Sequence, residues 1–452
     1  MCIFLLLSSE ITRNCIDAMV CGDVLGNMVL IVGMALFIVN VYVVDWTILR
    51  YGGIMTSFNL IHSSSWEGDT VKNRKLTFIE ATMLVAGAGI GTGILTIPYA
   101  VEQIGIFGTL TALAAAYGVS VLLYLIIADL TLNSKESAGL LGILQEHLLF
   151  GKNQSVLKTV FFVILTVLLL ENLVVYIMCA ADVLAAWFGI DTNLAKVIFY
   201  LLASLVIIFG IKGVGIGEKF SVTLIGSVIA ILTVLSLIAP KNSFSITFGE
   251  PHLVFAVYGL FMFAFSAIFS IIQVCNHIER VEDTKKAVVG GLSINACLTL
   301  IFAAAAILGS DQVTEIATIG LAATIGIPFV RIICSVFVLL AMFSSYWSSG
   351  LAFADMVEEQ FNLGKRWSWF LSTVPTILIA ILLPLTVLDY VQIGAGALSV
   401  ILVIVVLPAY YHAAKHSQKK LLLGKVGRSK ALLYAVGLMV VLMAVSSFIS
   451  ID

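Results

Sequence analysis

The sequence predicts an all-α membrane protein, and two observations support this fold class. Of the 452 residues, 61% are hydrophobic and 11% are charged, whereas about a quarter of the residues in an average soluble domain are charged. Apolar runs longer than about 18 residues recur along the chain, and each is long enough to cross a hydrocarbon core of roughly 30 Å. We therefore expect a lipid bilayer around most of the chain, and the net charge of −2 indicates no nucleic-acid partner.

Residues 1–54 form a hydrophobic N-terminal extension. Within it, residues 26–44 are uncharged and long enough to span a bilayer. Three interpretations stay open: an additional N-terminal helix, an uncleaved signal-anchor, and an upstream extension from a misassigned start codon. Met55 supports the last of these, because a chain that starts at Met55 is sensible without the preceding residues. Residues 55–78 would then form a polar lead-in, which we expect in the cytoplasm.

Eleven apolar segments follow the lead-in and are the predicted core transmembrane helices. They cover residues 79–101, 106–130, 157–187, 194–211, 219–239, 253–275, 287–309, 329–351, 367–386, 389–411 and 431–450. The glycine-rich stretch GVGIGEKFS from Gly213 lies just before the fifth segment, and we interpret it as a short loop. Two connections are longer than turns: residues 131–156 contain an amphipathic stretch expected on the cytoplasmic surface, and residues 310–328 form the main external loop.

The basic residues fall on one side of this topology. Of the 24 Lys and Arg residues, two precede Met55, nineteen lie on the side of the lead-in, and three (Lys196, Lys241 and Arg331) lie on the other. Because cytoplasmic loops of membrane proteins are enriched in Lys and Arg, this asymmetry supports both the helix count and a cytoplasmic position for residues 55–78. We expect the chain to lie in the cell membrane.

The most informative segment is the first, TMLVAGAGIGTGILTIPYA. Glycine alternates at Gly87, Gly89, Gly91 and Gly93, and each glycine costs a helix about 1 kcal/mol relative to alanine. A broken helix at membrane depth is tolerated where it lines a cavity, and its half-helix ends suit a carboxylate and a cation. Alternatively, the glycines form GxxxG pairs for close helix crossing.

The string GAGIGTGILTIPYA resembles the first helix of the amino acid/auxin permease branch of the amino acid–polyamine–organocation (APC) superfamily, and the resemblance extends from about Leu76 to His412. It implies a LeuT-type fold, in which five plus five helices form an inverted repeat and one extra helix follows. The implied domains are a first repeat at residues 79–239, a second at 240–412, and a basic loop with helix 11 at 413–452.

The resemblance also implies a substrate site between the first and sixth segments. In the family, backbone groups of the first helix hold the substrate's α-carboxylate, and a third-helix tyrosine reaches the substrate. The sixth segment contains the family's FAF pattern, although it has no glycine or proline between Gly259 and Gly290, so an ordinary aromatic-rich helix is the alternative there. The residues carried over to the site are Gly89, Ile90, Gly91, Thr92, Gly93, Tyr176, Phe265, Ser266 and Ala267.

Two further groups are candidates for coupling transport to an ion gradient. Glu171 lies at membrane depth in the third segment, where it serves either as a proton relay or substrate counter-charge, or as a hydrogen-bonded part of the architecture. In the eighth segment, hydroxyl groups either ligate sodium, as in sodium-driven superfamily members, or hold helices together. These hydroxyls belong to Ser344, Ser345, Ser348 and Ser349.

The functional prediction is a secondary active amino acid transporter that works by alternating access and is driven by a proton or sodium gradient. The alternatives are a permease of the same fold for a polyamine, nucleobase or metal ion, and a channel or membrane-embedded enzyme. No catalytic constellation, repeated filter or metal-ligand spacing is visible in the sequence, and its seven cysteines form no CxxC pair. We therefore expect no enzyme activity, no cofactor beyond a transported Na⁺ or H⁺, and no resident metal.

Overall fold

The computed structural model describes residues 75–134, 139–147, 154–238, 240–243, 245–382, 406–416, 421–424, 426–446 and 449. The N-terminal extension and most of the tenth predicted segment, 389–411, lie outside this part of the chain. Their interpretations, and the total of eleven helices, stay predictions.

The described chain consists of helices joined by short connections. The first half contains α4 (Phe78–Gly89), α5 (Thr92–Leu132), α6 (Leu140–His147), α7 (Gln154–Phe188), α8 (Thr192–Ile208) and α9 (Gly210–Ile238). The second half contains α10 (Pro251–Ala264), α11 (Ile268–His277), α12 (Thr284–Gly309), α13 (Ala317–Ile325), α14 (Pro328–Phe361), α15 (Lys365–Leu382), α17 (Leu407–His416) and α18 (Lys430–Ser446). Within the described residues, six helical stretches are long and apolar enough to cross a membrane, and α4, α8 and α18 are shorter apolar helices.

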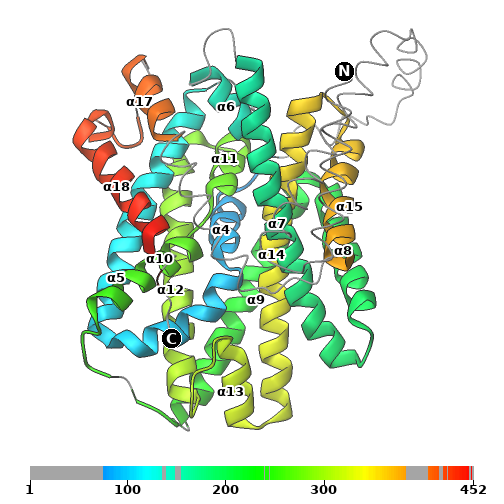
Figure 1. Ribbon diagram of the computed structural model, residues 1–452, viewed down its shortest axis with the longest axis vertical. Coiled ribbons are helices and arrows are strands. Elements are labelled where there is room, and N and C mark those ends of the chain that lie inside the picture. The colour runs from blue at the N-terminus through cyan, green and yellow to red at the C-terminus, as the bar shows by residue number, and fades with distance from the viewer. Residues whose placement is uncertain are drawn as a thin grey trace, which may run out of the picture.

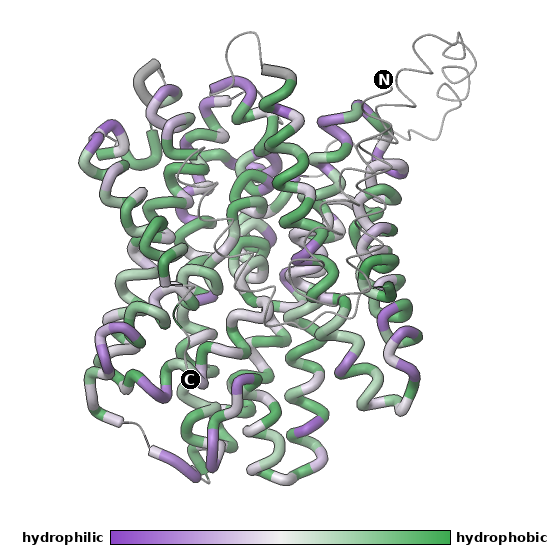
Figure 2. Tube along the Cα trace, in the orientation of Figure 1, coloured by the Kyte–Doolittle hydropathy of each residue, from purple (hydrophilic) through white to green (hydrophobic). Residues whose placement is uncertain are grey.

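The helices form one upright bundle, and the two long connections lie at its opposite ends. α6, in the amphipathic connection, lies at the upper end in Figure 1, and α13, in the predicted external loop, lies at the lower end. Hydrophobic residues predominate along the middle of the bundle, and hydrophilic ones gather toward both ends (Figure 2). On α8, the exposed side chains Leu201, Leu205 and Ile208 repeat at helical spacing, as expected for a face in contact with lipid.

One of two segment boundaries agrees with the prediction, and the other differs. The first and second segments are separate helices, as predicted: the run labelled α5 is interrupted at Gly105, whose φ of 66° and ψ of 179° are not helical, and Gly249 N donates to Ile104 O there. The predicted loop from Gly213 is wrong, since those residues lie inside α9. Its glycines serve close packing instead: a side chain at Gly215 would meet Leu76, and one at Gly217 would meet Trp347.

A main-chain tie joins the start of α4 to the end of α11. Leu76 N donates a hydrogen bond to His277 O at 2.8 Å, and Glu279 N donates one to Leu76 O at 3.0 Å. Leu76 and Ile278 form an isolated parallel β-bridge, and both side chains are buried. The tie therefore holds two helices together that are nearly 200 residues apart in the chain.

Candidate functional site

The first functional feature is a break between α4 and α5, where the glycine pattern predicts it. α4 ends at Gly89, and Ile90 N donates to Gly87 O at 2.9 Å. Gly91 has φ −118° and ψ −140°, and it precedes α5 without any side-chain cap. The first N–H groups of a helix have no partner within that helix, so those of Thr92 and Gly93 are free to bind a ligand.

The second break lies in the sixth predicted segment, although no glycine or proline marks it. α10 ends at Ala264, and Phe265 N and Ser266 N close its last turn by donating to carbonyl oxygens of α10 at 3.0 and 2.9 Å. α11 begins at Ile268. The structure thus has a second break at the residues that the family resemblance indicates, and the alternative of an uninterrupted helix is wrong.

Side chains from neighbouring helices satisfy the backbone groups that the second break exposes. Tyr124 Oη accepts a hydrogen bond from Ala267 N at 3.1 Å. Asn295 Nδ2 of α12 donates to Ala264 O at 2.8 Å, and Asn295 Oδ1 accepts from Thr299 Oγ1 at 3.0 Å. An unpaired buried backbone group is costly, so these partners from α5 and α12 explain why a helix without glycine can be broken here.

The two breaks lie against each other because Gly89 has no side chain. A Cβ at Gly89 would collide with both Ala264 O and Asn295 Nδ2. A Cβ at Gly93 would approach the Cα and Cβ of Ala264 to 3.2 Å. Both interpretations of the glycine pattern in the first segment therefore apply, since the glycines allow close packing and also interrupt the helix.

A cavity of about 70 Å³ lies where the breaks meet. Its polar part includes backbone of both breaks and side chains from α7 and α14. Its apolar part includes Leu168, Leu169, Phe263, Ile268 and Phe269. The complete set of lining residues is Ala88, Gly89, Gly91, Thr92, Gly93, Leu168, Leu169, Asn172, Tyr176, Phe263, Ser266, Ala267, Ile268, Phe269, Ser270, Ser348 and Ser349.

Most of the predicted substrate residues lie around this cavity. Seven of the nine line it, and the exceptions are Ile90 and Phe265, whose side chains are fully buried. Ile90 contributes through its backbone, because Ser345 Oγ donates to Ile90 O at 3.3 Å. Phe265 packs edge-to-face against Tyr117. That these residues bind a substrate stays a prediction.

The candidates for ion coupling do not lie together. Ser348 and Ser349 line the cavity, and Ser348 Oγ lies 2.6 Å from Ser270 Oγ of α11. Ser344 instead hydrogen-bonds a carboxyl group on α9, that of Glu218. Glu171 is buried, but it does not line the cavity. No group of three or more His, Cys, Asp or Glu side chains in the described part of the chain could hold a metal ion.

Sequence reasoning missed several residues of this region. Phe263, Phe269 and Ser270 line the cavity but were not selected, although each lies within four residues of the selected Ser266. Glu218 was missed because its glycine-rich surroundings suggested a loop. A helical reading of the same residues would have placed a lone carboxylate at membrane depth, which is a functional signal.

Comparisons with known proteins indicate a family and a fold. The sequence profile of the tryptophan/tyrosine permease family matches residues 74–447. No curated protein matches the sequence. Mhp1, a nucleobase-cation-symport-1 family transporter solved in a closed conformation with bromovinylhydantoin bound, matches with a TM-score of 0.62 and 15% identity over 83% of this chain and 91% of that chain. MhsT, solved in complex with L-phenylalanine, matches with a TM-score of 0.61 and 14% identity over 83% of this chain and 100% of that chain. At these identities the two structures establish the fold alone, which is the LeuT-type fold of APC-type transporters.

Proposed function

This chain belongs to the tryptophan/tyrosine permease family, and from that premise we propose that it carries aromatic amino acids through the cavity between its two broken helices. It is an integral membrane permease, a secondary transporter and not an enzyme. Beyond membership of the family, we propose how the substrate binds, how the chain lies across the membrane, and which kind of substrate side chain the cavity accepts.

The substrate's carboxylate binds at the start of α5. Thr92 and Gly93 offer uncapped N–H groups there, and the positive end of the helix dipole favours an anion. The break between α4 and α5 directs a free helix N-terminus into a cavity at membrane depth. This geometry is the main support for the proposed function. The substrate's ammonium group binds on the opposite side, near the carbonyl-rich ends of α4 and α10.

The apolar part of the cavity accepts the substrate's side chain. Phe263, Phe269 and Tyr176 present aromatic surface, and Leu168 and Leu169 of α7 add aliphatic surface. Aromatic rings favour offset or edge-to-face contacts with one another, which are worth about 0.5–1.5 kcal/mol beyond their buried area. A cavity with several aromatic walls therefore favours an aromatic over a small aliphatic amino acid.

Transport proceeds by alternating access. A volume of about 70 Å³ has room for a few water molecules, so an amino acid as large as tryptophan enters only after the lining helices move apart. The proposed domains are inverted repeats at residues 79–239 and 240–412, followed by a basic loop and the last helix at 413–452. The chain lies in the cell membrane, and residues 55–78 lie in the cytoplasm. The unequal distribution of Lys and Arg supports this orientation.

The direct test is uptake by purified full-length protein in liposomes. The panel contains L-tryptophan, L-tyrosine, L-phenylalanine, L-alanine, a nucleobase and a polyamine, each with a proton or a sodium gradient imposed separately. We expect accumulation of the aromatic amino acids. Accumulation of the nucleobase or the polyamine, with none of the amino acids, would refute the proposal.

A substitution at the start of α5 tests the binding mode. Thr92→Leu places a bulky apolar group at the free N-terminus and should abolish uptake while leaving a folded protein, judged by its elution from a sizing column. Thr111→Leu is the matched control, because Thr111 lies in α5 beyond Gly105, with an exposed side chain away from the cavity. Retained uptake by Thr92→Leu would contradict the assignment of the site.

A further inference from the structure

A buried carboxyl group on α9 lies outside the cavity and has no counter-charge. Glu218 is fully buried, and Ser344 Oγ donates a hydrogen bond to its Oε2. Its other oxygen, Oε1, has no hydrogen-bond partner in the described part of the chain, and no ion pair found there includes Glu218. Because an unpaired carboxylate is strongly disfavoured in a buried site, the group holds a proton in this conformation.

The helices packed against α9 present no charge to Glu218. From α4 the facing group is the backbone of Gly87, where a side chain would collide with the Glu218 carboxyl group. From α14 the facing group is the hydroxyl of Ser344. No charged side chain on these packed helices, or elsewhere on α9, forms a hydrogen bond or an ion pair with Glu218. The charged residues there are Glu80 on α4, Lys196 on α8, Lys212 and Lys219 on α9, Lys285 and Lys286 on α12, and Arg331, Asp355, Glu358 and Glu359 on α14.

A row of hydroxyl groups on α14 lies between Glu218 and the substrate cavity. Ser348 lines the cavity, and Ser344 lies one helical turn before it on the same face. Ser345, between them, bonds the backbone of the first break at Ile90. Hydroxyl groups both donate and accept hydrogen bonds, so water molecules between these hydroxyls would complete a path for a proton between the cavity and Glu218.

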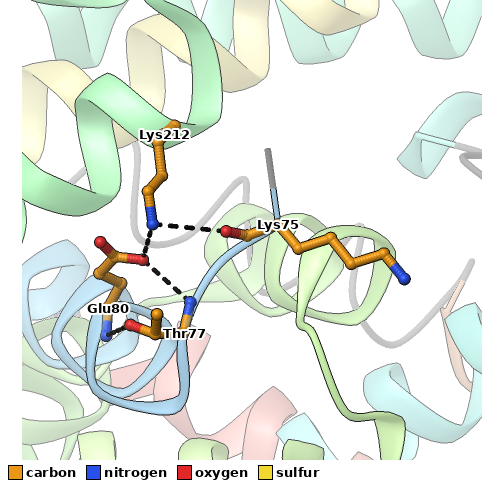
Figure 3. A network of polar contacts seen from close by, with 4 residues as sticks. All are labelled: Lys75, Thr77, Glu80 and Lys212. Atoms are coloured by element: carbon orange, nitrogen blue, oxygen red, sulfur yellow. Dashed lines mark hydrogen bonds and ion pairs between the residues drawn. The ribbon is translucent and has the colours of Figure 1, made fainter. Parts of the chain in front are cut away.

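An ion pair closes the other approach to Glu218. Lys212 lies six residues before Glu218 on α9, a rise of about 9 Å, and its Nζ is 2.5 Å from Glu80 Oε2 and 3.4 Å from Lys75 O. Thr77 N donates to the same Glu80 oxygen at 2.9 Å (Figure 3). These residues lie at the start of α4, so separation of α4 from α9 would break the pair and admit water toward Glu218.

We propose that Glu218 binds the coupling proton of this transporter, taking it up through the cavity and releasing it after the ion pair between Glu80 and Lys212 opens. The inference rests on the proposed function. A protonated Glu218 lets α4 pack closely at Gly87, whereas a charged Glu218 requires water and hence separation of α4 from α9 and α14. The proton and the substrate therefore favour the same closed arrangement, which couples their binding. The transferred species is one proton, bound to a carboxylate oxygen on one side of the membrane and released to water on the other.

The test compares driven accumulation with exchange in liposomes that contain full-length protein. Accumulation of L-tryptophan is measured with an imposed pH gradient, exchange of internal for external L-tryptophan with no gradient, and proton entry with a pH-sensitive dye. For Glu218→Gln we expect accumulation and substrate-induced proton entry to fall at least about tenfold, while exchange stays within about threefold and loses its dependence on pH. The matched control is Ser221→Ala, a buried and unpartnered hydroxyl one turn further along α9, which should keep all three activities.

The outcomes separate this inference from the proposed function. If wild-type protein exchanges no aromatic amino acid, the proposed function fails. If exchange is present but Glu218→Gln still accumulates L-tryptophan on a pH gradient, or if a sodium gradient alone drives wild-type accumulation, the role of Glu218 is refuted. Should Glu218→Gln fail to assemble, Glu218→Asp decides: a shifted pH profile of accumulation supports the role, and an unchanged profile overturns it.

Discussion

Two adjacent glycines on α12 provide a controlled test of how tightly α4 is held. A Cβ at Gly291 would lie 2.6 Å from Val85 Cβ and 2.7 Å from Thr82 O, whereas a Cβ at Gly290 would lie 3.4 Å from Thr82 Cγ2, an ordinary contact. Gly291→Ala therefore forces α4 and α12 apart by about 0.7 Å, and overpacking of this kind costs about 1–3 kcal/mol. Gly290→Ala forces no such movement.

The comparison isolates the packing energy because both substitutions bring the same gain in helix propensity, about 1 kcal/mol. We expect Gly290→Ala to melt at or above the wild-type temperature and Gly291→Ala to melt below it, a difference of about 1–3 kcal/mol between the variants. Because α4 leads directly into the first break, and a 1 Å displacement at a site can cost about a hundredfold in rate, uptake of L-tryptophan by Gly291→Ala should fall about tenfold. Melting followed by intrinsic fluorescence and initial rates of uptake provide the two measurements. Equal melting temperatures and equal uptake in the two variants would refute the tight packing of α4 on α12.

Two other contacts give predictions of the same kind. Glu80→Gln removes the charge that Lys212 pairs with, so the free energy that holds the start of α4 closed should fall by about 1.4 kcal/mol. Amide hydrogen exchange over residues 75–80 should then be about tenfold faster. Unchanged exchange would show that the ion pair does not hold this segment. Tyr124→Phe leaves Ala267 N without its acceptor, a cost of about 1–3 kcal/mol at the second break. The KM for L-tryptophan should then rise at least about threefold in uptake kinetics, and an unaltered KM would argue against a role for Tyr124 in shaping the site.

The parts of the fold that local sequence determines were predictable. Glycine at every second position from Gly87 to Gly93 weakens a helix whatever surrounds it, and the break occurs there. Apolar runs of membrane-spanning length gave the helices, and the amphipathic stretch gave α6. Each of these signals depends on residues within one or two helical turns.

The parts that depend on distant contacts were not predictable in the same way. The break at Phe265 to Ala267 has no local signal, because Tyr124 and Asn295 from other helices stabilise it; only the family resemblance indicated it. The glycines around Gly215 do not distinguish a loop from a helix, since glycine marks a loop or a close helix contact equally well. Here the glycines serve a close helix contact, because Leu76 and Trp347 pack against them. No local sequence pattern connects these two residues to α9.

The tie between Leu76 and Ile278 has a consequence for how sequences of this fold diverge. Its two hydrogen bonds join backbone atoms only, so they survive replacement of the side chains involved, except by proline at Leu76 or Glu279, because proline lacks the N–H group that donates. The anchor is therefore insensitive to substitutions that change side chains alone, whereas the packing of the breaks at Gly89 is not. Because it depends on no particular side chain, such a joint is compatible with the low identity, 14–15%, at which Mhp1 and MhsT are similar to this chain in fold.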